Sequence, residues 1–205
     1  MTAVREHHPF QPFLPARVEK LIVGSFPIGK FTNPARKSEF NPATEIDFYY
    51  GGDRNLLWKL VGQCFDRKFS SKEEIVSFLT TERIGVVDVV QSCERQNGSA
   101  ADSALKKIEF NPAMEAILKT PSLRRILFTS KLVNHWFLSQ RTWHCAAHVE
   151  QLVLLSPSPQ VSIYISGTEE FKRWKESNPE GDTRTFRLLQ YRSAFAKLNE
   201  KPNAD

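Results

Sequence analysis

Four short apolar runs, each about as long as one strand, constrain the fold of this chain most. They are Lys20–Ser25, Ile84–Val90, Arg125–Thr129 and Gln151–Leu155. Where the runs consist of β-branched residues, no polar residue interrupts them. Uninterrupted apolar runs are typical of strands that are covered by other elements on both faces of the sheet. Helical patterns separate them, and such alternation favours a mostly parallel sheet between two layers of helices. The sequence therefore predicts an α/β fold: a three-layer α/β/α arrangement around a short, mostly parallel four-stranded sheet.

The helices between these strands are predicted from caps and from apolar spacing. Ser71–Leu79 begins with a serine that can cap a helix, followed by acidic residues in the first turn. Asn111 and Pro112 place a cap and an initiating proline before another apolar stretch. The remaining predicted helices are Asn55–Phe65, Lys131–Ser139, Thr168–Glu176 and Thr183–Leu198.

The chain of 205 residues is long enough for one well-filled core and short for two. We therefore expect a single domain over residues 1–205, with residues 1–16 as an extended arm laid on the surface. Residues 30–47, rich in Lys, Arg, Asn and Pro, are expected to form an inserted loop. That loop is either a mobile lid that contacts a ligand or a solvated excursion.

Charge and composition limit the class of protein. There are 28 Lys+Arg against 23 Asp+Glu, a net charge of +5 that permits a polyanionic partner without requiring one. No apolar run approaches the ~20 residues that span a bilayer, and the N-terminus has no secretory apolar region. The three cysteines are widely spaced, which favours reduced thiols. We expect a cytoplasmic monomer with no membrane partner, no metal ion and no cofactor.

Loops that follow the predicted strands carry the polar residues. Because ligands bind outside the carboxyl ends of parallel strands, these loops are expected to converge on one edge of the sheet. They are Gly24–Pro27, Gln91–Arg95, Ser130–Lys131 and Ser156–Pro159. Asp88, inside an apolar strand, needs partners if buried, and anchoring a loop is its expected task.

In the segment Phe48–Trp58, the two aromatics Tyr49 and Tyr50, two glycines and an asparagine stand just before a helix. These residue types suit a site that grips a flat ring and presents a polar group to it. Ser156–Pro159 is a stiff loop with small hydroxyls, which can contact a phosphodiester or can simply end a strand.

Four motifs in this order resemble the uracil-DNA glycosylase superfamily, and most closely its deoxyinosine (hypoxanthine) and mismatch-specific branch. They are Gly24–Pro27, Tyr49–Trp58, Val87–Arg95 with Asp102 and Ser103, and Leu154–Pro159. The resemblance implies base-excision repair: a deaminated base, hypoxanthine or uracil, is flipped out of DNA and its N-glycosidic bond is cleaved without a metal.

The resemblance also implies roles for single residues. Tyr50 matches the aromatic that stacks on the flipped base, and Gly24, Ser25 and Phe26 match the first loop against base and sugar. Ser156, Pro157, Ser158 and Pro159 match the second loop, which pinches the DNA strand, and Lys131 can contact a phosphate. Asn55 matches the asparagine that orients water, although an asparagine here is equally a helix N-cap.

Two departures from the pattern keep other functions open. The first loop lacks the acid or amide of many members, and the second loop lacks the histidine that helps the base to leave. An alternative is therefore a catalytically inactive nucleic-acid-binding module on the same fold. A third hypothesis is a hydrolase of free nucleosides or nucleotides.

Overall fold

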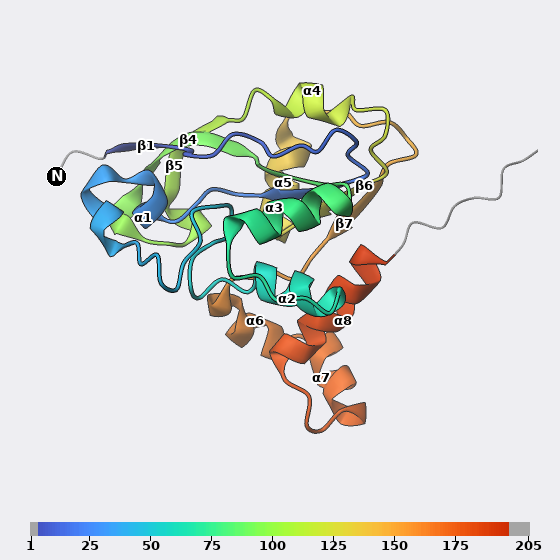
Figure 1. The fold of residues 1–205 in the computed structure, drawn as a ribbon. Coiled ribbons are helices and arrows are strands. Elements are labelled where there is room, and N and C mark those ends of the chain that lie inside the picture. The colour runs from blue at the N-terminus through green and yellow to red at the C-terminus, as the bar shows by residue number, and fades with distance from the viewer. Residues whose placement is uncertain (1–3, 197–205) are drawn as a thin grey trace, which may run out of the picture.

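The computed structural model describes residues 4–196, so residues 1–3 of the arm and residues 197–198 of the last predicted helix lie outside it. Its central sheet has four parallel strands in the order β3-β2-β6-β7 (Figure 1). Their bounds are β2 (Lys20–Gly24), β3 (Ile84–Asp88), β6 (Arg125–Phe128) and β7 (Glu150–Val153). The predicted α/β class and the parallel four-stranded sheet are confirmed.

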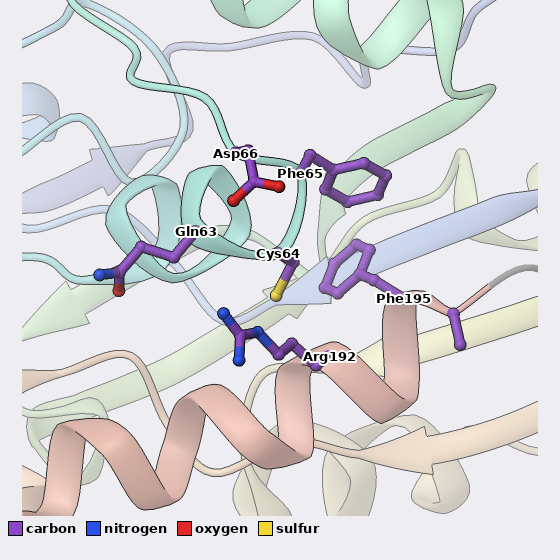
Figure 2. A pocket seen from close by; sticks show the side chains of 7 residues that line it. Gln63, Cys64, Phe65, Asp66, Arg192 and Phe195 are labelled. Atoms are coloured by element: carbon purple, nitrogen blue, oxygen red, sulfur yellow. The ribbon is translucent and has the colours of Figure 1, made fainter.

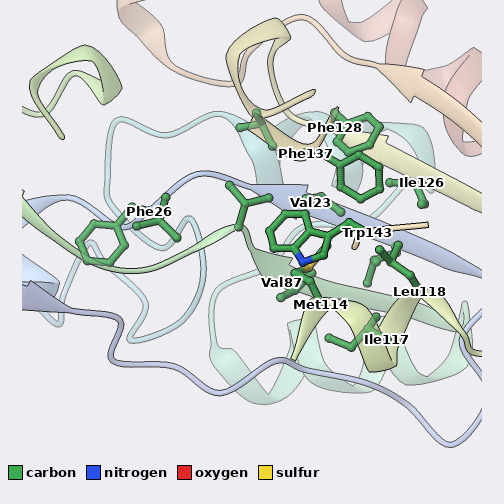
Figure 3. Packing of buried hydrophobic residues seen from close by; sticks show 14 of the residues in the cluster. Val23, Phe26, Val87, Met114, Ile117, Leu118, Ile126, Phe128, Phe137 and Trp143 are labelled. Atoms are coloured by element: carbon green, nitrogen blue, oxygen red, sulfur yellow. The ribbon is translucent and has the colours of Figure 1, made fainter. Parts of the chain in front are cut away.

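Helices cover both faces of this sheet because side chains alternate along the strands. Ile22 and Leu127 pack with α2 (Leu57–Cys64), α3 (Lys72–Thr81) and α8 (Thr183–Phe195). Their neighbours in the strands face the other way, toward α4 (Met114–Leu118) and α5 (Lys131–Ser139). Figure 3 shows that second cluster, in which Val23, Val87 and Phe128 lie with Met114, Phe137 and Trp143. The three-layer arrangement follows from continuously apolar strands.

A second sheet, which the sequence did not predict, has three antiparallel strands in the order β1-β4-β5. They are β1 (Arg5–His7), β4 (Val90–Arg95) and β5 (Leu105–Phe110). The prediction of a loop over Gln91–Arg95 is therefore wrong: β3 ends at Asp88, and Val89 separates it from β4. Antiparallel partners on either side turn this segment into a strand.

The N-terminal arm is extended, and two of its residues are buried. Residues 5–7 pair with β4, and Phe13 forms a bridge to Val86 of the central sheet. Glu6 and His8 are buried, at 3% and 7% exposure. The arm is therefore part of the packed structure.

The predicted inserted loop at residues 30–47 contains most of α1 (Gly29–Thr32) and the 3-10 helix η1 (Pro34–Glu39). It is held to the next segment by the buried side chain of Glu45. Glu45 Oε1 pairs with Lys30 Nζ at 2.6 Å and accepts from the Asp53 N–H at 3.2 Å. These contacts place the insertion beside the loop that carries Tyr50.

Predicted helices agree closely with those observed. The segment Lys131–Ser139 is confirmed with both bounds, and the others differ by one to three residues. The predicted helix Thr168–Glu176 is α7 (Glu169–Ser177), and it lies with α8 and the unpredicted α6 (Ser162–Ser166) beyond one face of the sheet (Figure 1). Three more 3-10 turns occur: η2 (Gln96–Gly98), η3 (Asp102–Ala104) and η4 (Pro159–Val161). Between residues 4 and 196, no helix is both long and apolar enough to cross a bilayer.

Candidate functional site

The carboxyl edge of the central sheet gathers several polar groups around Gly24, the last residue of β2. A Cβ on Gly24 would lie 1.7 Å from the Tyr50 hydroxyl oxygen and 2.1 Å from Asp88 Oδ1. Those two oxygens are therefore neighbours above the Gly24 backbone. The Tyr50 hydroxyl also donates to Thr129 Oγ1, just after β6, at 3.2 Å. Glycine is needed here because other groups approach its backbone closely.

Tyr50 is held in an unusual conformation. Its φ of 57° lies in the left-handed region, which costs a non-glycine residue about 1–2 kcal/mol. Burial of the hydroxyl raises the pKa of Tyr50 well above its usual value, with the nearby Asp88 carboxylate acting in the same direction. The phenol is therefore neutral, and it fills the space above Gly24 in this conformation.

Asp88 reaches this space from the end of β3. Its Oδ2 lies 3.0 Å from His8 Nε2, and His8 Nδ1 lies 2.9 Å from the carbonyl oxygen and 3.1 Å from the backbone nitrogen of Phe10. Asp88 Oδ1 is buried and has no hydrogen-bond partner among residues 4–196. A buried acceptor without a donor costs about 1–3 kcal/mol. The arm residue His8 thus satisfies one oxygen of Asp88 and leaves the other free toward Gly24 and Tyr50.

Ser25, the next residue of the first loop, is bonded to a carboxylate distant in sequence. Its hydroxyl donates to Asp102 Oδ1 at 2.9 Å. Burial raises the pKa of Asp102 to about 6, and the charge of Asp88 adds to the rise. The Ser25 hydrogen bond and the charge of Arg95 act the other way. A second carboxyl group therefore lies at the first loop and titrates near neutral pH.

Asn55 lies half-buried just before Leu56, the N-cap residue of α2. Asn55 Oδ1 accepts from the N–H of Leu57, the first residue of the helix, at 2.9 Å. The following N–H, of Leu56, donates to the carbonyl of Pro157 at 3.0 Å. The structure therefore brings Asn55 beside the second loop, with its side-chain oxygen bonded to the first N–H of α2.

The second loop follows β7 and is stiffened by its own contacts. Ser156 Oγ accepts from the Ser158 N–H at 3.2 Å, and Pro157 is buried while Pro159 is exposed. Lys131 is exposed at the first position of α5, directly after the Ser130 cap. Lys131 and the second loop thus follow β6 and β7, which are neighbours in the sheet.

The predicted site residues accordingly form two groups. Gly24, Ser25 and Tyr50 share contacts with Asp88, Thr129 and Asp102. Asn55 and the second loop form the other group. Phe26 is buried at 7% exposure, with its ring 5.7 Å from the Arg95 guanidinium, so its side chain belongs to the packing behind the loop.

A hollow elsewhere on the molecule lies at the opposite edge of the sheet. Figure 2 shows it between the ends of α2 and α8, lined by Gln63, Cys64, Phe65, Asp66, Arg192, Phe195 and Ala196. Arg125, the first residue of β6, donates to the carbonyls of Ala194 and Ala196, which places this end of α8 at the amino edge of the strands. Burial raises the pKa of the Cys64 thiol to about 11, so it is a poor nucleophile.

Within residues 4–196, no three His, Cys, Asp or Glu side chains are arranged to hold a metal ion.

Sequence reasoning missed the roles of Asp102 and His8. Asp102 belongs to one of the motifs that carry the resemblance, so the sequence pointed to this residue without assigning it a role. No local pattern reveals the pairing of His8 with Asp88, because 80 residues separate them. The expectation that Asp88 needs a partner is confirmed by His8.

Comparisons with known proteins support the fold. No family model and no curated protein matches this sequence. Among solved structures, the chain is similar to the solution NMR structure of a "putative Uracil DNA glycosylase" from Methanosarcina acetivorans. The TM-score is 0.58 at 23% sequence identity, over 90% of this chain and 99% of the other. The two proteins share a fold.

Proposed function

We propose that this protein is a DNA glycosylase of the uracil-DNA glycosylase superfamily that releases a deaminated base, hypoxanthine or uracil, from DNA. The observation that carries the proposal is the unpartnered Asp88 Oδ1 above Gly24 and beside Tyr50. The shared fold and the four ordered motifs support it.

Asp88 suits the recognition of a deaminated base by its chemistry. Hypoxanthine and uracil each carry a ring N–H where adenine and cytosine carry a nitrogen lone pair. An N–H can donate to the free Asp88 oxygen, whereas a lone pair would face it repulsively. A site with a buried polar group rejects ligands that leave it unpaired.

Tyr50 would have to turn for a base to enter. Its phenol occupies the space above Gly24, and its strained backbone favours release of that position. We propose that the ring then stacks on the flipped base, a contact that tolerates different ring systems. Lys131 and residues 156–159 would hold the flanking phosphates.

Asn55 is proposed to orient the attacking water. A carbonyl oxygen has two lone pairs, so Asn55 Oδ1 can accept from water while it also accepts from the Leu57 N–H. Cleavage leaves an anionic base and a sugar cation. The attacking water must therefore be placed at the face of the sugar opposite the leaving base.

The test is a panel of oligonucleotides with uracil, hypoxanthine, xanthine or mismatched thymine, single- and double-stranded, assayed for abasic product. We expect release of uracil or hypoxanthine and none of adenine or cytosine. Asn55→Ala should abolish release while DNA binding remains. Full activity of that variant would remove Asn55 from the mechanism.

The control variant must also lose a side-chain hydrogen bond at the start of a helix. Asn55→Ala removes such a bond, to the Leu57 N–H, together with the proposed contact with water. Ser71→Ala removes a similar bond, to the Glu74 N–H at the start of α3. Each change should cost about 1 kcal/mol of stability. Only Asn55→Ala should lose base release.

One observation favours the second candidate, a non-catalytic nucleic-acid-binding module. The Asn55 oxygen is already engaged by the Leu57 N–H, and the first loop carries no acid of its own. This module would bind DNA with steep salt dependence and yield no abasic product from any base in the panel.

A further inference from the structure

The Asp102 carboxyl group is bonded to the first loop, and the segment that precedes it is tied to the same loop by Arg95. Ser25 donates to Asp102 Oδ1 at 2.9 Å. Arg95 of β4 donates to the carbonyl of Pro27 at 2.6 Å and to that of Ser99 at 2.9 Å. One guanidinium therefore joins the end of the first loop to the loop that carries Asp102.

Arg95 is itself held in place. Its Nε pairs with Glu6 Oε2 of β1 at 3.0 Å, and both side chains are almost fully buried. The same Glu6 oxygen accepts from Thr32 Oγ1 at 2.6 Å. A buried, multiply bonded Arg95 fixes the backbone at Ser99, three residues before Asp102, relative to the end of the first loop. A site whose supporting segments are fixed before substrate arrives is preorganised for catalysis.

The two carboxylates of the site lie at different depths. Asp88 is 3% exposed at the end of β3, whereas Asp102 is only partly buried, beside the next residue of the first loop. A flipped nucleotide enters base first, so the deeper group meets the base and the outer group lies nearer the sugar. Charged or titratable groups acting on Asp102 are Asp88 and Arg95, and Tyr50 is close enough to feel its charge.

We propose that Asp102 is the general base of base excision, accepting the proton of the water that attacks the sugar. This inference rests on the proposed glycosylase function. In the step, the water oxygen forms a bond to C1′ and the C1′–N bond breaks, with its electron pair leaving on the base. The water proton passes to an Asp102 oxygen and is later released to the base anion or to solvent. Asn55, an amide, can orient that water but cannot take its proton.

The environment of Asp102 suits this task. Burial and Asp88 bring its pKa to about 6, so the group is ionised at neutral pH and basic enough to accept a proton. Two carboxyl groups in different surroundings, as Asp88 and Asp102 are, commonly divide their roles. Ser25 is the positioning residue, because its hydrogen bond orients the carboxylate and lowers that pKa.

The test measures single-turnover base release from the best substrate of the panel against pH. Asp102→Asn keeps an oxygen that Ser25 can bond and removes the base. We expect a rate at least 100-fold lower at pH 7.5 and an unchanged Kd for DNA. The acidic limb of the pH–rate profile, which is the fall in rate as pH drops through about 6, should be lost. Glu115→Gln, the same kind of change at an exposed position of α4, should match the wild type.

Substitutions of Ser25 distinguish its positioning role from the catalytic role of Asp102. Ser25→Ala removes a hydrogen bond that lowers the Asp102 pKa, so the acidic limb should move to higher pH. Its plateau rate should fall less than that of Asp102→Asn. Ser25→Thr retains the hydroxyl and should restore the limb toward that of the wild type.

The outcomes distinguish this inference from the proposed function. An active wild type with Asp102→Asn within threefold of it, and with an unchanged acidic limb, overturns the role of Asp102 and leaves the glycosylase standing. A wild type that yields no abasic product from any base overturns both. Thermal unfolding of Asp102→Asn shows whether a lost rate reflects the fold, since a folded variant must unfold as cooperatively as the wild type.

Discussion

The two sheets of this protein are stabilised in different ways. The four-stranded parallel sheet consists of apolar runs that pack on both faces, and β2 and β3 are completely buried. The three-stranded antiparallel sheet carries more charged residues: β5 reads Leu-Lys-Lys-Ile-Glu-Phe with only Leu105 buried. Val90 and Cys93 of β4 nevertheless belong with Leu105 to the hydrophobic core. The buried Glu6–Arg95 pair links β1 to β4. The parallel sheet is thus stabilised mainly by hydrophobic burial, whereas the antiparallel sheet combines apolar packing with long-range polar contacts.

The candidate site lies where the two sheets meet. The parallel sheet supplies Gly24, Asp88 and Thr129 at its carboxyl edge. The antiparallel sheet supplies Arg95 and, just before β5, Asp102. The comparison teaches that the apolar sheet builds the floor of the site, while the polar sheet positions the group that we assign to proton transfer.

Arg95→Met should have the largest effect on stability, because it leaves Glu6 buried and uncompensated. We expect a loss of about 3–5 kcal/mol in the free energy of unfolding, measured by urea denaturation. The double change Glu6→Met with Arg95→Met should recover part of it. Lys119→Met, which breaks the exposed pair with Glu115, should cost no more than about 0.5 kcal/mol. Equal losses for Arg95→Met and Lys119→Met would show that the buried Glu6–Arg95 pair stabilises the antiparallel sheet no more than an exposed helix pair stabilises its helix.

Gly24→Ala tests the floor of the site. The added methyl group meets the Tyr50 hydroxyl and Asp88 Oδ1, so one of them must move, at a cost of about 1–3 kcal/mol. Base release should fall at least tenfold, because the space for the base is narrowed. Gly167→Ala is the matched control, since its nearest contact would be an ordinary 3.5 Å. Wild-type activity of Gly24→Ala would place the base elsewhere.

Asp102→Asn should give the smallest change in stability, and the change should be a gain. The folded-state pKa of Asp102 is raised from 3.8 to about 6, so the stability linked to its protonated form is present below pH 4 and is lost as pH rises through 6. Removing the charge should therefore stabilise the protein by about 1–2 kcal/mol at pH 7.5, after discounting for partial exposure.

Unfolding of Asp102→Asn and the wild type at pH 4, 5.5 and 7.5 checks this sign. The difference should vanish at pH 4 and grow with pH. A variant that is less stable than the wild type at pH 7.5 would contradict an energetic cost of the Asp102 charge. A more stable but inactive variant would show that this cost is retained for function.

Sequence patterns predicted the parallel sheet well and the antiparallel sheet not at all. The run Arg125–Thr129 became β6 with one residue fewer, because burial on both faces leaves a pattern in the sequence itself. In β4, register shifts between Val90, Ser92 and Glu94 interrupt the period of two that marks a strand. Its partners stand near residue 5 and near residue 106, so nothing local indicates the pairing.

The candidate site divides in the same way. Gly24, Ser25, Tyr50 and Asn55 could be proposed from the sequence because its motifs resemble those of a known family. The roles of Asp102 and His8 could not, because hydrogen bonds across 77 and 80 residues create them. The sequence also left Asn55 open between a helix N-cap and a water-orienting residue; in the structure Leu56 is the N-cap, and Asn55 Oδ1 accepts from the Leu57 N–H.

By itself, the sequence determined the class of fold, the central strands and the edge of the sheet where polar loops gather, since apolar periodicity is a local property of the chain. The tertiary structure alone decided which charged groups meet at that edge. The arm turns His8 onto Asp88, and Arg95 fixes the loop that brings Asp102 to Ser25. Such pairings depend on chain segments brought together by folding, and their energies arise only once water has been excluded from around them.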